Sequence, residues 1–478
     1  MLAFENLLIP KAHERKWMIE RRNQDEPRVL SFAQEALWYV HQLDPSSPVY
    51  NVAFFSRLRG NLDVPAFEGS LNAVVDRHEI LRTVFLVSKG VPAPCPIEKR
   101  RVDLKQTDLR NLPESERETE LKHLVEIESS RPFNLSRDLM LRPFLFRMAK
   151  EEYAFLHVAP HIVFEGGSLD VFYRDLAAFY DQLVAGREPQ LPQLPFEYCD
   201  FAAWQRKQLQ GKRLENLNRY WKKQLTGTVT LDLPTDFPRP AIHTQRGSRR
   251  LFALPPELMA AANATFGKVK TTAYRGLFAT FAVFLQCYTG STDICVSSPF
   301  APTWYPKVQE LIGFFVNTTA VRVDLSGNPP FAEVLKRVDR ALWGAMMHSD
   351  LPYGKVVELV RPLRDTSRMP LTQVNFRAPR QRHPALQLSG MSGTCAEIVD
   401  NGTSKFDLAV EVESSMGQVC HFEFCTDLFR AETIFKMEQD FQNLLRAMIT
   451  EPDSPLTQVS AVRDVSSCVR QRAAPISG

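Results

Sequence analysis

Apolar and polar positions in the first part of the chain follow the spacing of helices and strands in turn. The run SFAQEALWYV from Ser31 predicts an amphipathic helix, and VYNVAFFSRL from Val49 predicts a strand. The run AFEGSLNAVVDRHEILRTVF from Ala66 predicts a helix that leads into a strand. The pattern therefore predicts an α/β protein rather than an all-helical one.

A second strand and helix follow, joined by a turn that contains two glycines. YAFLHVAP from Tyr153 predicts a short buried strand. Beyond the turn, apolar residues recur at intervals of four, three and four on one face of a helix: Phe172, Leu176, Phe179 and Leu183. Ser168 is the expected N-cap of this helix, with Asp170 in its first turn.

Proline-rich segments divide the chain into two parts. One segment covers about 186–195 and the other is LDLPTDFPRPAIHTQRG from Leu231, and a helical stretch lies between them. A second α/β series follows, from about 250 to 457. We therefore expect a flexible or loosely docked lead-in (1–28), an N-terminal lobe (29–205), a C-terminal lobe (206–463) and a disordered tail (464–478).

Composition and charge narrow the class of function. The 478 residues include 44% hydrophobic and 24% charged residues, as in ordinary globular proteins. The 58 basic and 55 acidic residues leave a formal charge of +3, too small for electrostatic binding of nucleic acid or an anionic membrane. The longest apolar run, LFATFAVFL from Leu277, is about half a membrane span, and the opening residues do not form a signal peptide. These features predict a cytoplasmic protein.

Eight cysteines are scattered along the chain, with no C-x-x-C pair and no His spacing that suits zinc. This usage is typical of reduced, mostly buried thiols. We expect neither a disulfide framework nor a metal.

The chemical candidate is the turn between the second strand and its helix, from Pro160 to Ser168. His161 lies at the strand end, and Glu165 follows four residues later, just before Gly166 and Gly167. An imidazole beside a helix N-terminus is able to act as a base of near-neutral pKa. The pattern alone is more typical of a structural His and Glu pair than of a catalytic one. His157, on the preceding strand, is expected to pack inward, and His78 to pack a helix on a strand.

Ordered motifs over about 430 residues identify a family. The chain resembles the condensation domain of nonribosomal peptide synthetases, within the chloramphenicol acetyltransferase-like superfamily. Its motifs are, in order, SFAQEALWYVHQLDP, RHEILRTVF, PHIVFEGGS in place of His-His-x-x-x-Asp-Gly, YCDFAAWQ, LIGFFVNTT, HSDLPYGKVVE and RDTSRMPLTQVNF. The late run SKFDLAVEV, with Asp407, resembles a strand that crosses between lobes.

The resemblance implies two acetyltransferase-like lobes in a V-shaped pseudo-dimer with a central tunnel. Donor and acceptor carrier proteins, peptidyl or acyl, would insert phosphopantetheine arms from opposite ends, and the domain would need no cofactor of its own. His161 corresponds to the second signature His, which assists attack of the acceptor on the thioester. Gly166 corresponds to the signature Gly, whose N–H contributes to oxyanion stabilisation. Asn375 and Thr303 are candidates for the tunnel wall.

The signature also departs from the family pattern at three positions. Pro160 replaces the first His, and Glu165 replaces an Asp that has a structural role at the site. Thr303 stands where the family carries the Arg that pairs with that Asp. Glu165 is therefore expected to find another cation, such as Arg322 or Lys307, or to be solvated, or to be protonated.

These residues lead to three hypotheses of function. The first is an acyltransferase that joins a carrier-bound acyl or peptidyl donor to an amine. The second is its nearest variant, which forms an ester with a hydroxyl acceptor. The third is a degenerate domain that recruits carrier proteins without turnover. Only about 15 residues follow PLTQVSAV, and no adenylation, carrier or thioesterase motif is present. We expect a monomeric, free-standing enzyme, with excision from a larger synthetase as the alternative.

Overall fold

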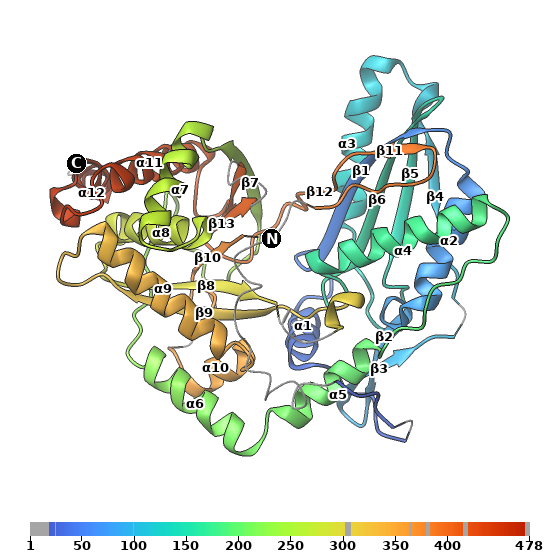
Figure 1. Cartoon of the computed structure of the whole chain (residues 1–478), viewed down its shortest axis with the longest axis horizontal. Helices are drawn as coiled ribbons and strands as arrows, with labels where there is room; N and C mark the ends of the chain where they lie inside the picture. Colours follow the sequence, from blue (N-terminus) through green and yellow to red (C-terminus); the bar gives the residue numbers. More distant parts are fainter. Residues whose placement is uncertain are drawn as a thin grey trace.

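The computed structural model describes residues 19–23, 25–98, 100–301, 307–363, 365–378, 383–413 and 419–473. These residues form a mixed α/β structure with two lobes, each built on a six-stranded sheet with its own hydrophobic core. The predicted two-lobe α/β fold is confirmed. In Figure 1 the lobes diverge toward the top and converge near α1 and α5, which is the expected V.

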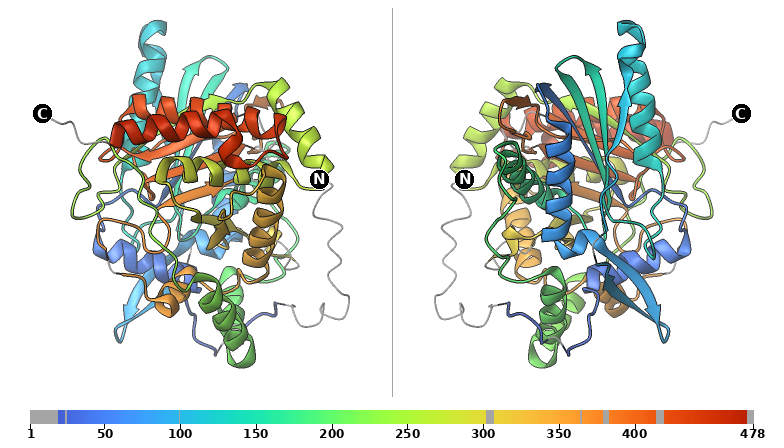
Figure 2. Two further views of the ribbon diagram at one scale, coloured as in Figure 1. Left: turned by 90° about the vertical axis from the view of Figure 1, so that its left-hand side faces the viewer. Right: turned by 90° about the vertical axis from the view of Figure 1, so that its right-hand side faces the viewer.

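The N-terminal lobe contains a sheet of strand order β11-β1-β6-β5-β4, with β12 also paired to β1. Its strands are β1 (Asn51–Gly60), β4 (Lys105–Asp108), β5 (Arg142–Ala149), β6 (Glu152–Pro160), β11 (Met391–Gly393) and β12 (Glu397–Ile398), and a separate hairpin holds β2 (Thr83–Ser88) and β3 (Val91–Pro96). Its helices are α1 (Phe32–Leu43), α2 (Val64–Arg77), α3 (Glu114–Ser130), α4 (Gly166–Val184) and α5 (Tyr198–Gln208). Short 3₁₀ turns cover Glu79–Arg82 and Leu109–Asn111. Figure 2 shows α2 and α4 on one face of the sheet and α3 on the other.

The helices of this lobe form where the sequence supplies both a cap and an apolar face. Ser31 and Gln34 make a capping box at the start of α1, and Asp63 caps α2. In α4, Phe172, Leu176 and Phe179 are buried. The predicted helical face of α4 therefore packs on the sheet, because the apolar side chains gain more from burial than they lose in side-chain entropy.

The C-terminal lobe contains a sheet of strand order β7-β14-β13-β10-β8-β9. Its strands are β7 (Gly247–Ala253), β8 (Asp293–Phe300), β9 (Asn317–Asp324), β10 (Val374–Arg377), β13 (Leu408–Glu413) and β14 (Val419–Cys425). Its helices are α6 (Gly211–Leu225), α7 (Pro256–Lys268), α8 (Ala273–Thr289), α9 (Phe331–Met347), α10 (Tyr353–Val360), α11 (Ala431–Thr450) and α12 (Ser460–Ala473), with 3₁₀ turns at Val308–Glu310 and Leu456–Gln458. The apolar run of α8 is buried throughout, so α8 is the core helix that its length predicts. Among the described helices, none combines the length and apolarity that a membrane span requires.

Two segments of the C-terminal half join the N-terminal lobe. Strands β11 and β12 pair with β1, in the registers Leu58 to Gly393 and Phe54 to Ile398. Leu311, together with its neighbours Ile312 and Phe315, is buried in the core of the N-terminal lobe. The N-terminal lobe therefore includes segments from the C-terminal half of the chain, and a single domain boundary near residue 205 does not describe this arrangement.

Both ends of the described chain are more ordered than the sequence suggests. The backbone N–H of Arg22 donates to Asp200 on α5, and Arg28 forms a bidentate ion pair with Glu79 in the first 3₁₀ turn, so these two lead-in residues are docked on the N-terminal lobe. Helix α12 continues to Ala473, with Val465 buried in the core, where a disordered tail was expected from 464. Apolar side chains spaced along α12 give the tail a face to bury.

Candidate functional site

The candidate turn is anchored to the neighbouring strand β1. Strand β6 ends at Pro160, which pairs with Asn51, and the N–H of His161 donates to the carbonyl of Tyr50 at 2.7 Å. The N–H of Val163 donates to the carbonyl of Pro160 at 3.0 Å and closes the turn. His161 is therefore held by backbone bonds at the end of the central strands.

One hydrogen bond determines which ring nitrogen of His161 carries the proton. Its Nδ1 lies 2.7 Å from the carbonyl oxygen of Phe164, and because a carbonyl only accepts, Nδ1 carries the proton. The lone pair therefore lies on Nε2 of a half-buried ring. Burial, together with the charges of Lys405 and Arg377, lowers the pKa of His161 to about 3, against the hydrogen bond to Phe164. His161 is thus neutral near pH 7 and available as a hydrogen-bond acceptor.

Glu165 is buried at 5% exposure and has backbone partners instead of a cation. Its Oε2 accepts from the N–H groups of Phe315 and Val316, at 3.0 and 2.9 Å. Burial raises the pKa of Glu165 to about 7, and the two backbone hydrogen bonds limit the rise. Near neutral pH the side chain is therefore partly protonated.

Among the described ion pairs, neither cation suggested for Glu165 contacts it, whereas the raised pKa of Glu165 agrees with the alternative of protonation. Arg322 forms a bidentate ion pair with Asp293, at 2.7 and 2.8 Å. Lys307 is exposed. A carboxylate needs donors rather than a net charge, and two backbone N–H groups supply them here.

Ser168 is not the N-cap of α4. Glu165 caps the helix, and Ser168 is the third residue within it. The Ser168 hydroxyl donates to the carbonyl of Gly313 at 2.9 Å and accepts from the Gly313 N–H at 3.0 Å. The start of α4 thus serves as a dock for residues 313–316, which come from the C-terminal half of the chain.

This docking determines what covers His161. The hydroxyl of Tyr198, on α5, donates to the carbonyl of Phe314 at 2.5 Å. With its backbone fixed in this way, Phe314 places its ring centroid 4.6 Å from that of His161. Glu165 and Ser168 therefore position one aromatic wall of the site rather than face the reacting groups.

Gly166 is the first residue of α4, and it is exposed. The N–H of a first helical residue has no acceptor within its own helix, so it is available to an anion or oxyanion. A Cβ at this position would lie 3.7 Å from Cε1 of His383, an ordinary contact. The predicted role of Gly166 in catalysis stays a prediction.

Of the two residues suggested for the tunnel wall, only Asn375 lies within the described part of the chain. Asn375 is buried in β10, where its Nδ2 donates to the carbonyl and hydroxyl oxygens of Ser297 on β8, at 3.1 and 2.8 Å. Thr303 lies outside the described residues. The tunnel itself stays a prediction.

The histidines expected to be structural do pack in the core. His157 is fully buried and stacks on the rings of Phe54 and Phe155, and burial lowers its pKa to about 3. His78 is buried against Asp175, with Nε2 2.8 Å from the carboxylate. The expectation for His157 is confirmed. His78 is structural as well, but it joins the end of α2 to α4 rather than packing a helix on a strand.

A group of charged residues beside the site was missed from the sequence. Four of them form a closed ring of alternating charge on neighbouring strands, with contacts of 2.9–3.4 Å: Arg249, Arg377, Glu411 and Glu423. Lys405, in the loop before β13, places Nζ 4.6 Å from the ring centroid of Tyr50. The four residues of the ring are spread over more than 150 positions, so they form no local sequence pattern. In the segment that contains Lys405, the sequence motif drew attention to Asp407 instead.

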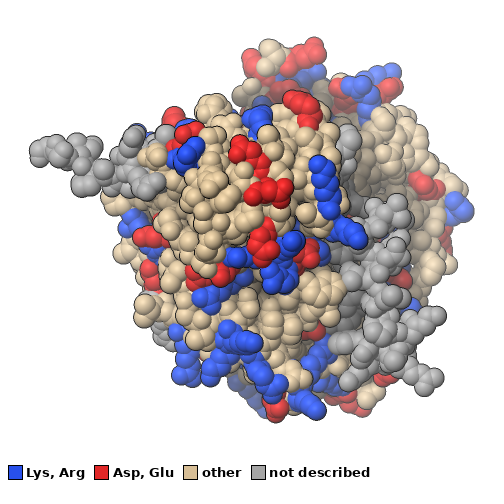
Figure 3. Space-filling model, turned by 60° about the vertical axis from the view of Figure 1, so that its left-hand side comes forward, with Lys and Arg blue, Asp and Glu red and all other residues tan. Residues whose placement is uncertain are grey.

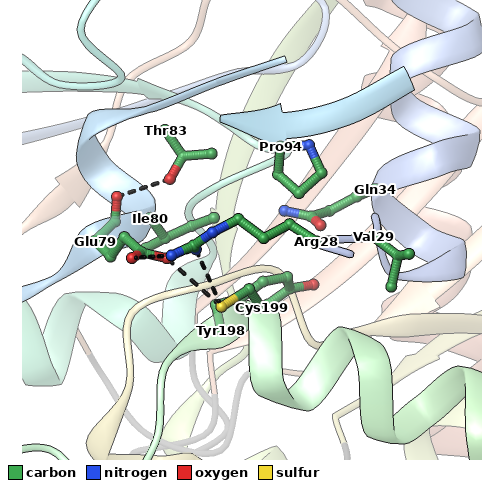
Figure 4. Close-up of a pocket in the computed structure, with 9 residues that line it drawn as sticks. All are labelled: Arg28, Val29, Gln34, Glu79, Ile80, Thr83, Pro94, Tyr198 and Cys199. Atoms are coloured by element: carbon green, nitrogen blue, oxygen red, sulfur yellow. Dashed lines mark hydrogen bonds and ion pairs between the residues drawn. The ribbon is translucent and has the colours of Figure 1, made fainter. Parts of the chain in front are cut away.

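Two cavities lie away from His161. The one in Figure 4 is crossed by the ion pair of Arg28 with Glu79, and Cys199 lies beside it. Burial raises the pKa of Cys199 to about 12, so its thiol stays protonated. The second lies between the lobes, lined by α5 residues such as Trp204 and by Phe315 and Asn317. His161 lines neither of these two cavities.

A charged-ligand or metal site requires charged or ligating side chains to gather, on the surface or among the described His, Cys, Asp and Glu residues. Figure 3 shows Lys and Arg mixed with Asp and Glu over the face drawn. Within the described ranges, His, Cys, Asp and Glu do not gather in groups of three or more that suit a metal ion.

Comparisons with known proteins agree with one another. The sequence profile described as the condensation domain matches residues 24–467. One protein of the linear gramicidin synthase from Brevibacillus parabrevis is 40% identical over 446 residues, which are 93% of this chain and 6% of that protein. The chain therefore spans only a small part of this relative.

Solved structures show the same fold. The X-domain from teicoplanin biosynthesis matches with a TM-score of 0.84 and 25% identity, over 93% of this chain and 99% of that one. The structure described as the complex of the X-domain and OxyB matches with a TM-score of 0.82 and 25% identity, over 93% and 98% of the two chains.

Proposed function

The chain belongs to the condensation-domain family, and from that premise we propose that it transfers an acyl or peptidyl group from a carrier-protein thioester to an amine, forming an amide. Members of this family act with carrier domains of nonribosomal peptide synthetases and use no cofactor of their own. The proposed substrates are thioesters on the phosphopantetheine arms of donor and acceptor carriers. The tautomer of His161 is the observation that carries the proposal.

The proposed reaction requires a neutral amine at the thioester carbonyl. The amine nitrogen attacks the carbonyl carbon, the new C–N bond forms, and the C–S bond breaks to release the donor thiol, which takes up the proton lost from nitrogen. Nε2 of His161 accepts a hydrogen bond from an amine N–H and so directs the nitrogen lone pair. The N–H of Gly166 stabilises the oxyanion of the tetrahedral intermediate.

The low pKa of His161 favours an amine over a hydroxyl acceptor. An aminoacyl α-amine has a pKa of about 8, so an appreciable fraction is already neutral near pH 7. A hydroxyl needs a base to remove its proton, and an imidazole with a pKa of about 3 is a weak base. Amide formation, through positioning rather than deprotonation, is therefore the function that the geometry supports best.

A second candidate function is recruitment of a partner without turnover. It is favoured by the likeness to the X-domain, whose structure with OxyB is among the matches. The replacement of the first signature His by Pro160 and of the Asp by Glu165 also favours it. The two functions make opposite predictions for transfer.

One experiment separates them. The purified chain is mixed with an acyl-loaded donor carrier and an aminoacyl-loaded acceptor carrier, and the acceptor is followed by intact-protein mass spectrometry. We expect transfer by the wild type and a loss of up to about 10²-fold in H161A, below the range for full general-base catalysis. The control is H123A, because His123 is exposed on α3. Carrier binding without transfer by the wild type would instead establish the recruiting domain.

A further inference from the structure

Lys405 and His161 both contact Tyr50 of the N-terminal lobe, Lys405 through its ring and His161 through its carbonyl. The ammonium of Lys405 lies over the ring of Tyr50, 4.6 Å from its centroid, a cation–π contact. The carbonyl of Tyr50 accepts the N–H of His161 at 2.7 Å. A cation from the C-terminal half of the chain is thus held next to the turn that carries the imidazole.

The charge of Lys405 is not matched by a carboxylate. In the neighbouring ring, each of the two glutamates contacts both arginines, so two negative charges balance two positive ones. Among the described residues, Lys405 has no ion pair. Outside them, the only acidic residues in the sequence are Glu5 and Glu14. Lys405 is therefore a surplus positive charge beside the site.

We propose that Lys405 is a positioning residue whose charge adds to the effect of burial in disfavouring a cationic His161 and favours the free-amine form of the acceptor. The second part rests on the proposed function. A fixed cation raises the energy of any second cation nearby, whether imidazolium or ammonium, and leaves the neutral forms unaffected. Because Lys405 acts through its charge, we expect arginine to preserve its effect and an apolar side chain of similar length to abolish it.

The surroundings support this role. The groups that act on Lys405 or contact it are Tyr50 before β1, Arg249 on β7, Arg377 on β10 and Glu423 on β14. Glu411 on β13 is paired with the two arginines. Burial, Arg377 and Arg249 lower the pKa of Lys405 to about 8, against the attraction of Glu423. Lys405 is therefore charged at pH 7 and loses its charge at alkaline pH, where an acceptor amine is neutral without help.

A thiol placed at position 161 tests the charge effect without any substrate. The variants H161C/K405R and H161C/K405M are compared, because Arg stays charged at every pH used and Met has a similar length without charge. The alkylation rate of the introduced thiol by iodoacetamide is followed from pH 6 to 10 by peptide mass spectrometry. We expect its pKa to be lower by about one unit with K405R. Equal pKa values in the two variants would overturn the proposal.

The transfer assay tests the effect on the acceptor. At pH 6.5 we expect K405M to be slower than wild type by roughly tenfold, with K405R near wild type, and all three rates to converge at pH 9. A loss in K405M that is the same at every pH overturns the proposal, because a purely structural defect has no reason to recover. K405Q gives the same comparison if K405M fails to fold. If no protein transfers but the thiol pKa values differ, the proposed function fails and the charge effect on position 161 stands.

Discussion

Replacing Glu165 by Gln removes a titratable group from the buried contact between α4 and residues 313–316. Gln has the same length and keeps an acceptor oxygen for the N–H groups of Phe315 and Val316. It loses only the ability to ionise. The variant therefore isolates the cost of a negative charge in this buried position.

The size of that cost follows from the pKa of Glu165. It is about 7 in the folded protein against an ordinary value of 4.5, so the folded state holds the proton more tightly than the unfolded chain. Below pH 4.5 both states are protonated and the wild type has no penalty. Between pH 4.5 and 7 its stability falls by about 1.4 kcal/mol per pH unit, and above pH 7 the full penalty is about 3 kcal/mol.

The expected result is a pH-dependent gain in stability. E165Q should be more stable than the wild type by up to about 3 kcal/mol at pH 8.5, and by less than about 1.5 kcal/mol at pH 5.5. Urea unfolding followed by tryptophan fluorescence at the two pH values measures the difference. The control is E188Q, because Glu188 is an exposed carboxylate between α4 and α5, and it should change neither curve.

The reasoning is refuted if the free energies of unfolding of E165Q and the wild type differ by the same amount at both pH values. It is also refuted if E165Q is less stable than the wild type mainly at pH 8.5. Either result would mean that the carboxylate is stabilised as an anion by partners that Gln does not replace.

Three further substitutions test the site and its frame. G166A should leave unfolding and transfer within about twofold of wild type, because the N–H is kept and the Cβ meets only His383 at 3.7 Å; a selective loss of transfer would place substrate against Cα. G313A should cost about 1–3 kcal/mol in urea unfolding, because its Cβ would overlap the ring of Tyr198, whereas G267A, with open space around it, should cost almost nothing. D407N should cost about 3 kcal/mol in the same assay, because it leaves half-buried Arg239 without the bidentate carboxylate of buried Asp407, and an unchanged midpoint would contradict that role.

Local patterns in the sequence were sufficient to predict individual helices and strands, but not the exchange of β11, β12 and residues 311–315 between the lobes. The apolar spacing of Phe172, Leu176 and Phe179 predicts the buried face of α4, and the run from Tyr153 predicts β6. The position of His161 at the strand end follows from the same pattern. These features depend on residues close together in the chain.

The details of the site depend on contacts that no local pattern encodes. Glu165 binds backbone groups 150 and 151 residues away, and backbone N–H groups carry no mark in a sequence. Ser168 has the right residue type for an N-cap, but the approach of Gly313 gives its hydroxyl another partner. Lys405 contacts the aromatic ring of Tyr50, which belongs to the other lobe and lies 355 residues earlier in the chain.

The pairing of β11 and β12 with β1 has a consequence for any shortened form of the protein. A fragment that ends before these strands leaves one side of β1 without hydrogen-bond partners over much of its length. Such an open edge is a template for association with other chains. The first 240 residues expressed alone should therefore oligomerise or precipitate, and a synthetic peptide covering residues 386–399 should reduce this association by pairing with β1.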